Sequence, residues 1–252
     1  EYQIMLQQKQ LKVLLIGDSC IDEYVYGSCE RINPEAPVPI LKYYRIEKSE
    51  GMTNNVRKNL MSFGIKVHTI TNKETIIKRR YIEEKYNQQM LRVDEEPDIS
   101  PMNSNIPYDN YDALVISDYN KGFLTTEKIV KLTKSFKGPV FIDTKKNKLP
   151  KVEAYVKINE HEYKNFESNI ENLIVTRGSK GCEYKGKLYP AEKVNVFDVV
   201  GAGDTFLSAL VFFYLTLGSI DSALPLANKA ASISVSNFGT YSLTSKDIKT
   251  LS

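Results

Sequence analysis

Short apolar runs alternate along the chain with segments whose apolar residues recur at helical spacing. The apolar runs are typical of buried strands and cover 11–17, 112–118, 139–143 and the segments that end at 158–159 and 175–176. Helical spacing covers 54–63, 125–136, 204–217 and 220–236, and Gly64 fits the end of the first helix. Since strands that alternate with helices build a parallel sheet, the pattern predicts an α/β fold: a Rossmann-like, mostly parallel sheet sandwiched by helices.

Three further segments predict strands with a different composition. Residues 38–46 are expected to form an edge strand, because Pro39 lacks the N–H that a central strand needs. Residues 66–71 and 75–93 also predict strands, and the second segment is rich in Tyr, Ile and charged residues.

Polar residues stand at the ends of five predicted strands: Asp18, Asp118, Asp143, Asn159 and Thr176. Ligands of open α/β sheets bind outside the carboxyl ends of the strands. One polar strand end would carry little weight, but five along the same edge predict one long cleft. The first strand is expected to lead into a functional loop.

Composition and charge narrow the classes of function. The chain has 252 residues, 42% of them hydrophobic and 26% charged, which fits one globular domain over 1–252. A net charge of +3 without a long basic tract argues against a nucleic-acid partner, and no apolar run is long enough to cross a membrane. Three cysteines and two histidines without a Cys-x-x-Cys motif favour a reducing cytoplasm and argue against disulfides and zinc.

The segment 198–205, Asp-Val-Val-Gly-Ala-Gly-Asp-Thr, carries the most specific chemistry. Gly201, Ala202 and Gly203 form a tight loop before a helix expected to begin near Thr205, so backbone N–H groups and the helix dipole can hold an anion. Asp204 stands where it can accept a proton, an arrangement that suits phosphoryl transfer to a hydroxyl. Taken alone, the short motif favours a glycine turn capped by an Asp before a core helix, and the surrounding chain changes that balance.

Two other motifs offer contacts for a nucleotide. Asn159 and Glu162 lie three residues apart at a strand-to-helix turn and could hold Mg²⁺, although a helix cap would have the same spacing. The turn after the strand that ends at 175–176 could hold phosphate oxygens through backbone N–H groups and a cation, and it could also be a plain hairpin. Its candidate residues are Thr176, Arg177, Gly178 and Gly181.

Candidate contacts for a sugar lie in the first half of the chain. Asp22, and the segment from Gly51 to Asn55, could bind hydroxyl groups through carboxylate and amide groups. Four separate cations could meet a second phosphate, although each taken singly fits a solvated charge on a strand. They are Lys78, Arg80, Arg92 and Lys121.

The order of these motifs resembles the ribokinase-like (PfkB) sugar kinases, and most closely the D-glycero-β-D-manno-heptose 7-phosphate kinase domain of ADP-heptose biosynthesis. Four stretches carry the narrower resemblance, which covers about 12–247. They are 17–27, 31–39 (Arg-Ile-Asn-Pro-Glu-Ala-Pro-Val-Pro), 87–94 and 117–122.

The resemblance implies ATP and Mg²⁺, a small β-strand lid built from about 23–46 and 75–93, and Asp204 as the base toward the anomeric hydroxyl of a heptose 7-phosphate. It implies a homodimer formed through the lid strands. It places Lys145 near the phosphates and Asn228 near adenine, and it adds Arg31, Gln89 and Asp118 to the substrate contacts.

The chain also departs from this family pattern. Met52 replaces a glycine, Val199 and Val200 lack a hydroxyl that relatives often carry, and the segments at 71–75 and 162–172 are short. No nucleotidyltransferase domain follows, although bifunctional relatives carry one. A kinase of another sugar or nucleoside, and a relative that binds nucleotide without turnover, therefore remain alternatives.

Overall fold

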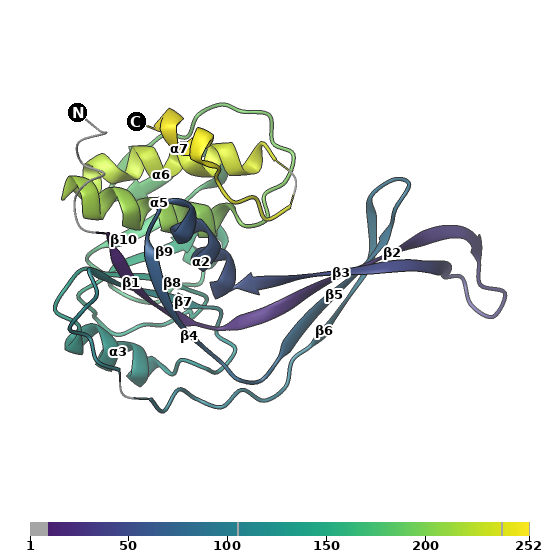
Figure 1. The fold of residues 1–252 in the computed structure, drawn as a ribbon, viewed down its shortest axis with the longest axis horizontal. Helices are drawn as coiled ribbons and strands as arrows, with labels where there is room; N and C mark the ends of the chain where they lie inside the picture. The colour runs from purple at the N-terminus through teal and green to yellow at the C-terminus, as the bar shows by residue number, and fades with distance from the viewer. Residues whose placement is uncertain (1–9, 105, 238, 252) are drawn as a thin grey trace.

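The computed structural model describes residues 10–104, 106–237 and 239–251, which form a body and a projecting lid (Figure 1). The body contains a sheet in the order β12-β11-β10-β9-β8-β7-β1-β4, and all its pairs are parallel except those of β11. The strands are β1 (Lys12–Gly17), β4 (Lys66–Thr71), β7 (Ala113–Asp118), β8 (Val140–Thr144), β9 (Tyr155–Asn159), β10 (Leu173–Thr176), β11 (Cys182–Tyr184) and β12 (Lys187–Tyr189). The predicted single domain extends over 1–9 and 252 as well, which lie outside the described residues.

Helices cover both faces of this sheet (Figure 1). One face carries α2 (Thr53–Ser62), α5 (Ala202–Leu217), α6 (Ile220–Val235) and α7 (Ser245–Leu251), and the other carries α3 (Thr126–Ser135). The short α4 (Glu160–Tyr163) and the 3₁₀ turn η1 (Gly178–Lys180) follow β9 and β10. None of the helices in the described ranges is long and apolar enough to span a membrane.

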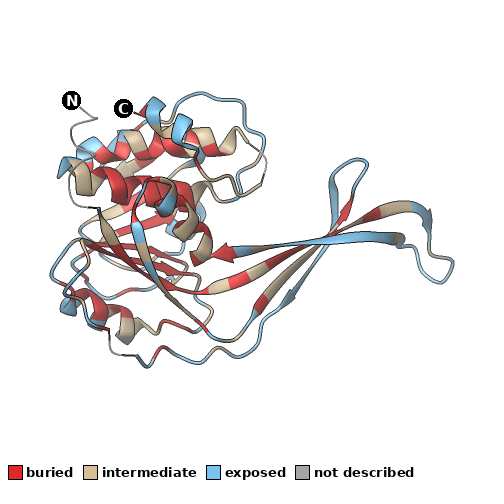
Figure 2. Ribbon diagram, in the orientation of Figure 1, coloured by how far each residue is buried: buried red, intermediate tan, exposed pale blue. Residues whose placement is uncertain are grey.

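The core explains why the central strands read as continuous apolar runs. Along β1, Val13 and Leu15 pack under α2, α5 and α6, while Leu14 and Ile16 pack on the side of α3. All four side chains are fully buried, as the red central strands in Figure 2 show. Successive side chains of a strand point to opposite faces, so a strand covered on both faces needs apolar residues at every position.

The lid is a second sheet in the order β3-β2-β5-β6. Its strands are β2 (Ser19–Ile32), β3 (Pro39–Met52), β5 (Ile76–Glu83) and β6 (Gln88–Glu95). The expectation of a loop after the first strand is wrong, because only Asp18 separates β1 from β2. The Asp18 N–H bonds to the Ser117 carbonyl and the Ser19 N–H to Asn72, so the chain passes directly from one sheet into the other.

Most element boundaries agree with the predicted ones within a few residues, but the strand predicted at 38–46 continues to Met52, and the segment 75–93 forms two strands, β5 and β6. The start of α5 differs: the helix begins at Ala202, not near Thr205, because Gly201 adopts a left-handed φ of 80° and serves as the N-cap. Gly203 and Asp204 therefore lie inside the first helical turn. The α7 helix was not predicted.

Candidate active site

The polar strand ends meet along one edge of the large sheet. Register pairs Thr176 of β10 with Asn159 of β9, and Asp143 of β8 with Ser117 of β7, so the strand ends stand side by side. Beyond this edge lies a cavity of about 660 Å³ between the sheet and the start of α5. Its lining includes Tyr119, Asp143, Lys145, Lys157, Asn159, Thr176, Gly178, Gly181, Gly201, Ala202, Gly203, Asp204 and Asn228.

Asp204 lies at the inner end of this cavity. The side chain is in the first turn of α5 and only 5% of the residue is exposed. The Tyr119 hydroxyl donates a hydrogen bond to Asp204 Oδ1 over 3.1 Å. The Asp204 N–H donates to the Gly201 carbonyl over 3.0 Å, and the positive end of the helix dipole at this turn favours negative charge beside it.

The surroundings of Asp204 set its proton affinity. Burial raises its pKa from the ordinary 3.8 to about 6, and the charge of Asp143 acts in the same direction. Lys157, the hydrogen bond from Tyr119 and Lys145 oppose this increase. A carboxyl group with a pKa near 6 is ionised at neutral pH and accepts a proton more readily than an ordinary Asp, as a general base requires.

Lys157 and Asp143 form a buried ion pair beneath the helix start. Lys157 is 3% exposed, and its Nζ lies 2.7 Å from Asp143 Oδ2. Burial raises the pKa of Asp143, but Lys157 and Lys145 outweigh it and the net shift is downward. A Cβ on Gly203 would lie 2.8 Å from Lys157 Nζ, so a glycine lets this cation approach the turn that precedes Asp204.

Asn159 and Glu162 form a complete capping box. The Asn159 side chain accepts from the Glu162 N–H, and the Glu162 carboxylate accepts from the Asn159 N–H, each over 2.8 Å. Lys145 pairs with Glu162 as well and lies 3.8 Å from Asp143. The alternative of a helix cap is thus present in the structure, and it holds the Glu162 carboxylate against Lys145, which lines the cavity.

The four predicted residues of the turn after β10 differ in whether they face the cavity. Thr176, Gly178 and Gly181 line the cavity. Arg177 does not: its guanidinium pairs with Glu183 over 2.8 Å and with Glu160 over 3.2 Å. Two carboxylates hold the Arg177 guanidinium, and Arg177 does not line the cavity into which its predicted role would direct it.

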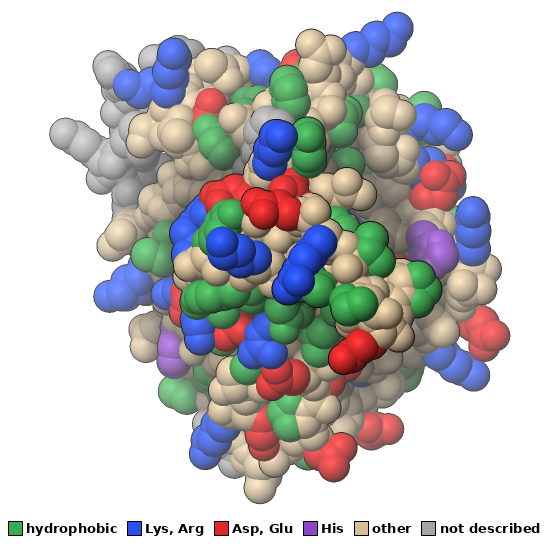
Figure 3. Space-filling view, turned by 90° about the vertical axis from the view of Figure 1, so that its right-hand side faces the viewer, with side chains coloured by type: hydrophobic (Ala, Val, Ile, Leu, Met, Phe, Trp, Pro, Cys, Tyr) green, Lys and Arg blue, Asp and Glu red, His purple; other side chains and the backbone are tan. Residues whose placement is uncertain are grey.

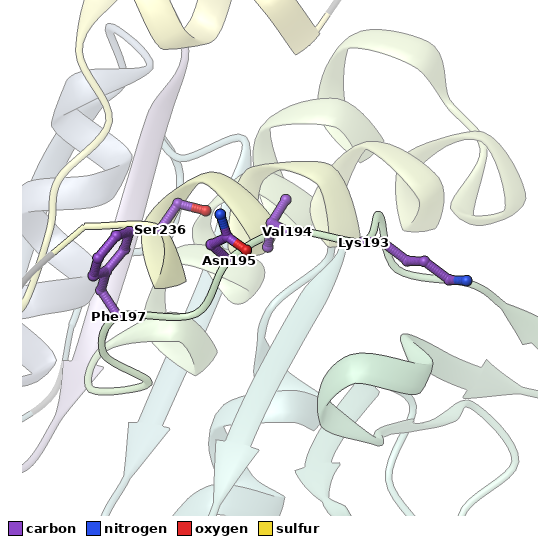
Figure 4. Close-up of a pocket in the computed structure, with 5 residues that line it drawn as sticks. All are labelled: Lys193, Val194, Asn195, Phe197 and Ser236. Carbon is purple, nitrogen blue, oxygen red and sulfur yellow. The ribbon is translucent and has the colours of Figure 1, made fainter.

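The outer part of the cavity is more apolar. Val194, Val196, Ala231 and Val235 contribute to its lining, a composition that fits a flat ring. Asn228 lines the same space, but its side-chain N–H₂ donates to the Tyr189 carbonyl over 2.7 Å. Figure 4 shows the neighbouring hollow on segment 193–197, where Phe197 and Ser236 lie beside the end of α6.

The inward face of the lid carries the predicted sugar contacts. Asp22 Oδ1 accepts from Arg80 over 2.5 Å. Gly51 lies against Asp22, where a Cβ would overlap the carboxylate and come within 2.8 Å of Cys20 Sγ. Asn55 is buried on α2, directly after the β3 strand that carries Gly51.

The four predicted cations lie on or next to the lid strands near Asp22, and they differ in whether a carboxylate forms an ion pair with them. Register places Arg80 of β5 directly opposite Arg92 of β6, an arrangement of like charges that destabilises a sheet. Arg80 pairs with Asp22, Arg92 with Asp94 over 2.5 Å, and Lys121 with Glu96. For Lys78 no carboxylate within ion-pair distance is found among the described residues, and its Nζ lies 5.7 Å from the centre of the Tyr119 ring.

None of the ten predicted substrate contacts lines the cavity of the single chain, and three of them also lie apart from the group around Asp22. Arg31 is exposed and pairs in register with Ile40 next to the 33–38 tip of the lid, and Gln89 is exposed at the start of β6. The lid strands carry both residues away from the body (Figure 1). Asp118 is buried and accepts from Thr144 over 2.6 Å and from the Asn120 N–H over 3.1 Å, so it holds the turn after β7.

Two residues of the site were missed in the sequence. Lys157 interrupts an otherwise apolar stretch of β9, and a charge inside a buried strand is a signal for a functional or paired group. Tyr119 belongs to the segment 117–122 that carries the family resemblance, but no local pattern indicated that its hydroxyl meets Asp204.

Comparisons with solved structures confirm the predicted fold. Ribokinase from Thermotoga maritima superposes with a TM-score of 0.68 at 17% identity, covering 96% of this chain and 99% of that one. Phosphofructokinase-2 from Escherichia coli, in complex with potassium, gives a TM-score of 0.69 at 14% identity, covering 97% and 98%. The body and lid thus form a ribokinase-like fold.

Curated relatives resemble the chain along nearly its whole length. The bifunctional protein HldE of Campylobacter jejuni is 32% identical over 304 aligned positions, and that of Pasteurella multocida is 30% identical over 310. The alignments cover 97% and 98% of this chain, which spans 65% of the length of each relative. Both alignments have more positions than the 252 residues of the chain, as expected if the relatives carry residues that its short segments lack.

The profile of the pfkB family carbohydrate kinases matches residues 54–247, which is most of the chain. This match confirms the prediction of a carbohydrate kinase, and the cavity, the strand-end motifs and the start of α5 lie within the matched range or beside it. The chain therefore belongs to the pfkB family of carbohydrate kinases.

Proposed function

We propose that the chain transfers the γ-phosphoryl group of ATP to the anomeric hydroxyl of a heptose 7-phosphate, giving a 1,7-bisphosphate. The two HldE relatives support this substrate class. The observation that carries it is the group of cations Lys78, Arg80 and Arg92 on neighbouring lid strands, in which Lys78 has no carboxylate within ion-pair distance among the described residues. A phosphate on the sugar would give Lys78 an anionic partner, whereas a neutral sugar would leave this lysine without one.

The residues of the cavity suit an in-line displacement. Asp204 takes the proton of the sugar hydroxyl while the hydroxyl oxygen forms a bond to the γ-phosphorus and the bond to ADP breaks. The N–H groups at the start of α5, with Lys157 beside Gly203, face the negative charge that spreads over the transferred group. Lys145 lines the same cavity as Asp204 and can hold the phosphates of ATP.

Magnesium fits the nucleotide end of the site as an ion held mainly by water and phosphate. No group of three or more Asp, Glu, His or Cys side chains that could bind a metal directly occurs among the described residues. The Asn159 and Glu162 oxygens are engaged in the capping box, but carboxylate and carbonyl oxygens keep lone pairs for a water of the ion. The ion would neutralise charge on the phosphates.

We also propose that two lids associate in a homodimer. Figure 3 views the lid end-on and shows apolar side chains among Lys and Arg on its surface. Nine large apolar residues of the lid are exposed: Ile32, Val38, Tyr43, Tyr44, Ile46, Tyr86, Met90, Leu91 and Val93. Such a patch is typical of an interaction surface. Pairing of two lids would bury it and would bring Arg31 and Gln89 next to a second chain.

The cytoplasm remains the predicted location.

A phosphotransfer assay over a panel of sugars tests the proposed substrate. Lys78→Met removes the one of the four predicted cations for which no carboxylate partner is found among the described residues, and Lys42→Met, on an exposed part of β3, is the matched control. For heptose 7-phosphate we expect the KM to rise at least about tenfold in the Lys78 variant, as for a lost charged hydrogen bond, and to stay unchanged in the control. Equal use of neutral heptose and its 7-phosphate by the wild type would contradict the proposal.

A further inference from the structure

Tyr119 connects the parts of the site that handle the acceptor, the base and the nucleotide. Its hydroxyl donates to Asp204 Oδ1 over 3.1 Å. Burial and the nearby carboxylates Asp204 and Asp143 raise the pKa of this hydroxyl well above its usual value, so it keeps its proton and acts as a donor.

Two buried carboxylates hold the backbone that carries Tyr119. The buried carboxylate of Asp18 accepts from the Tyr119 N–H over 2.8 Å, and Asp118 accepts from the Asn120 N–H over 3.1 Å. Asn120 has a φ of 57°, in the left-handed region that Asn tolerates better than most residues. These contacts fix the turn between β7 and the following segment, so the ring has a defined position.

The ring itself is supported on one side and flanked by cations. It packs against the buried cluster of Cys20, Met52 and Ile76 at the root of the lid. Lys78 of the lid and Lys145 of the nucleotide side each place Nζ 5.7 Å from the ring centre. A ring face attracts cations at this distance. Tyr119 therefore lies between the lid and the nucleotide end of the cavity.

We infer that Tyr119 is a positioning residue for the base: its hydroxyl holds Asp204 Oδ1 and leaves Oδ2 to take the proton of the acceptor. This inference rests on the proposed role of Asp204 in phosphoryl transfer. The contact with the cluster of Cys20, Met52 and Ile76 gives Met52 a function, since its side chain helps to support the ring that orients the base.

The charged groups around Asp204 define what loss of the hydroxyl should change. Asp143 on β8, Lys145 after β8 and Lys157 on β9 face the carboxyl group, and Cys20 of β2 faces Tyr119. Tyr119→Phe leaves these groups in place and removes one hydrogen bond that favours the ionised form of Asp204. The pKa of Asp204 should therefore rise by about one unit, as expected for a hydrogen bond to a charged group.

Two measurements test the inference on the full chain, with Tyr108→Phe, on the opposite face of the sheet, as the control. The acid limb of the kcat/KM profile should move up by about one pH unit in Tyr119→Phe, with the KM for ATP unchanged. A ¹³C NMR titration of Asp carboxyl groups, with Asp204→Asn for assignment, should show the same increase without any sugar. Wild-type turnover with an unchanged profile and an unchanged titration in Tyr119→Phe would overturn the inference. Absence of wild-type turnover on any sugar, with the titration shifted, would instead overturn the proposed function.

Discussion

Replacing Asp204 with Asn should stabilise the folded chain at alkaline pH while it slows phosphotransfer at least about 10²-fold. Asp204 is buried, and its pKa is raised from 3.8 to about 6. The folded chain therefore binds this proton more tightly than the unfolded chain, so stability is lost as the pH rises through about 6. Asn carries no charge at any pH, and its carbonyl oxygen can still accept the hydrogen bond from Tyr119.

The size of the effect follows from the pKa difference. The pKa difference between 3.8 in the unfolded chain and about 6 in the folded chain means that, at pH 8, the ionised carboxylate lowers the free energy of unfolding by about 3 kcal/mol. About half of this cost remains at pH 5, because much of the folded protein then holds the proton. We therefore expect Asp204→Asn to be more stable than the wild type by about 3 kcal/mol at pH 8 and by about half of that at pH 5.

Urea unfolding followed by circular dichroism at the two pH values measures this difference. Asp109→Asn, which removes an exposed carboxylate, should change the free energy of unfolding by less than about 0.5 kcal/mol at either pH. Equal stability of Asp204→Asn and wild type at pH 8 would refute the claim that the base is held as a costly buried charge.

Three further variants test other parts of the site. Met52 is buried with a φ of 55°, a backbone strain that Met52→Ala keeps and Met52→Gly relieves. In urea unfolding, the Gly variant should therefore be more stable than the Ala variant by about 1 kcal/mol. An Ala variant more stable than the Gly variant would contradict the claim of backbone strain at this position. Lys157→Met should lower the free energy of unfolding by about 3–5 kcal/mol, because it removes the ion-pair partner of the buried Asp143 carboxylate. Adding Asp143→Leu should restore most of this loss. A double variant as unstable as Lys157→Met would argue against a buried ion pair. Gly51→Ala should displace Asp22 and raise the KM for the sugar about tenfold with little change for ATP, and an unchanged KM would remove Asp22 from the sugar site.

Much of the fold could be predicted because its signals are local. Runs such as Val13 to Ile16 are apolar at every position since both faces of the strand are covered, and polar residues follow where the strand leaves the core. The left-handed Gly201 is also a local feature, but its effect, an earlier start of α5, depends on the turn geometry and was misjudged.

The contacts within the site depend on register between strands distant in sequence. The pairing of Arg80 with Arg92 and the approach of Lys157 to Gly203 follow from how strands and a helix meet, and no spacing along the chain encodes them. For the same reason, motif resemblance indicated Arg31 as a substrate contact, whereas the long lid strands place it far from the cavity of its own chain.

The central claim is that Asp204 directs phosphoryl transfer to the anomeric hydroxyl of a sugar that already carries a phosphate. The most direct measurement incubates the chain with ATP, magnesium and heptose 7-phosphate and follows the products by ³¹P NMR. We expect ADP and a second sugar phosphate signal coupled to the anomeric proton to appear in equal amounts, and Asp204→Asn to slow their formation by at least about 10²-fold. A product phosphorylated elsewhere, or an Asp204→Asn variant as fast as the wild type, would contradict the account.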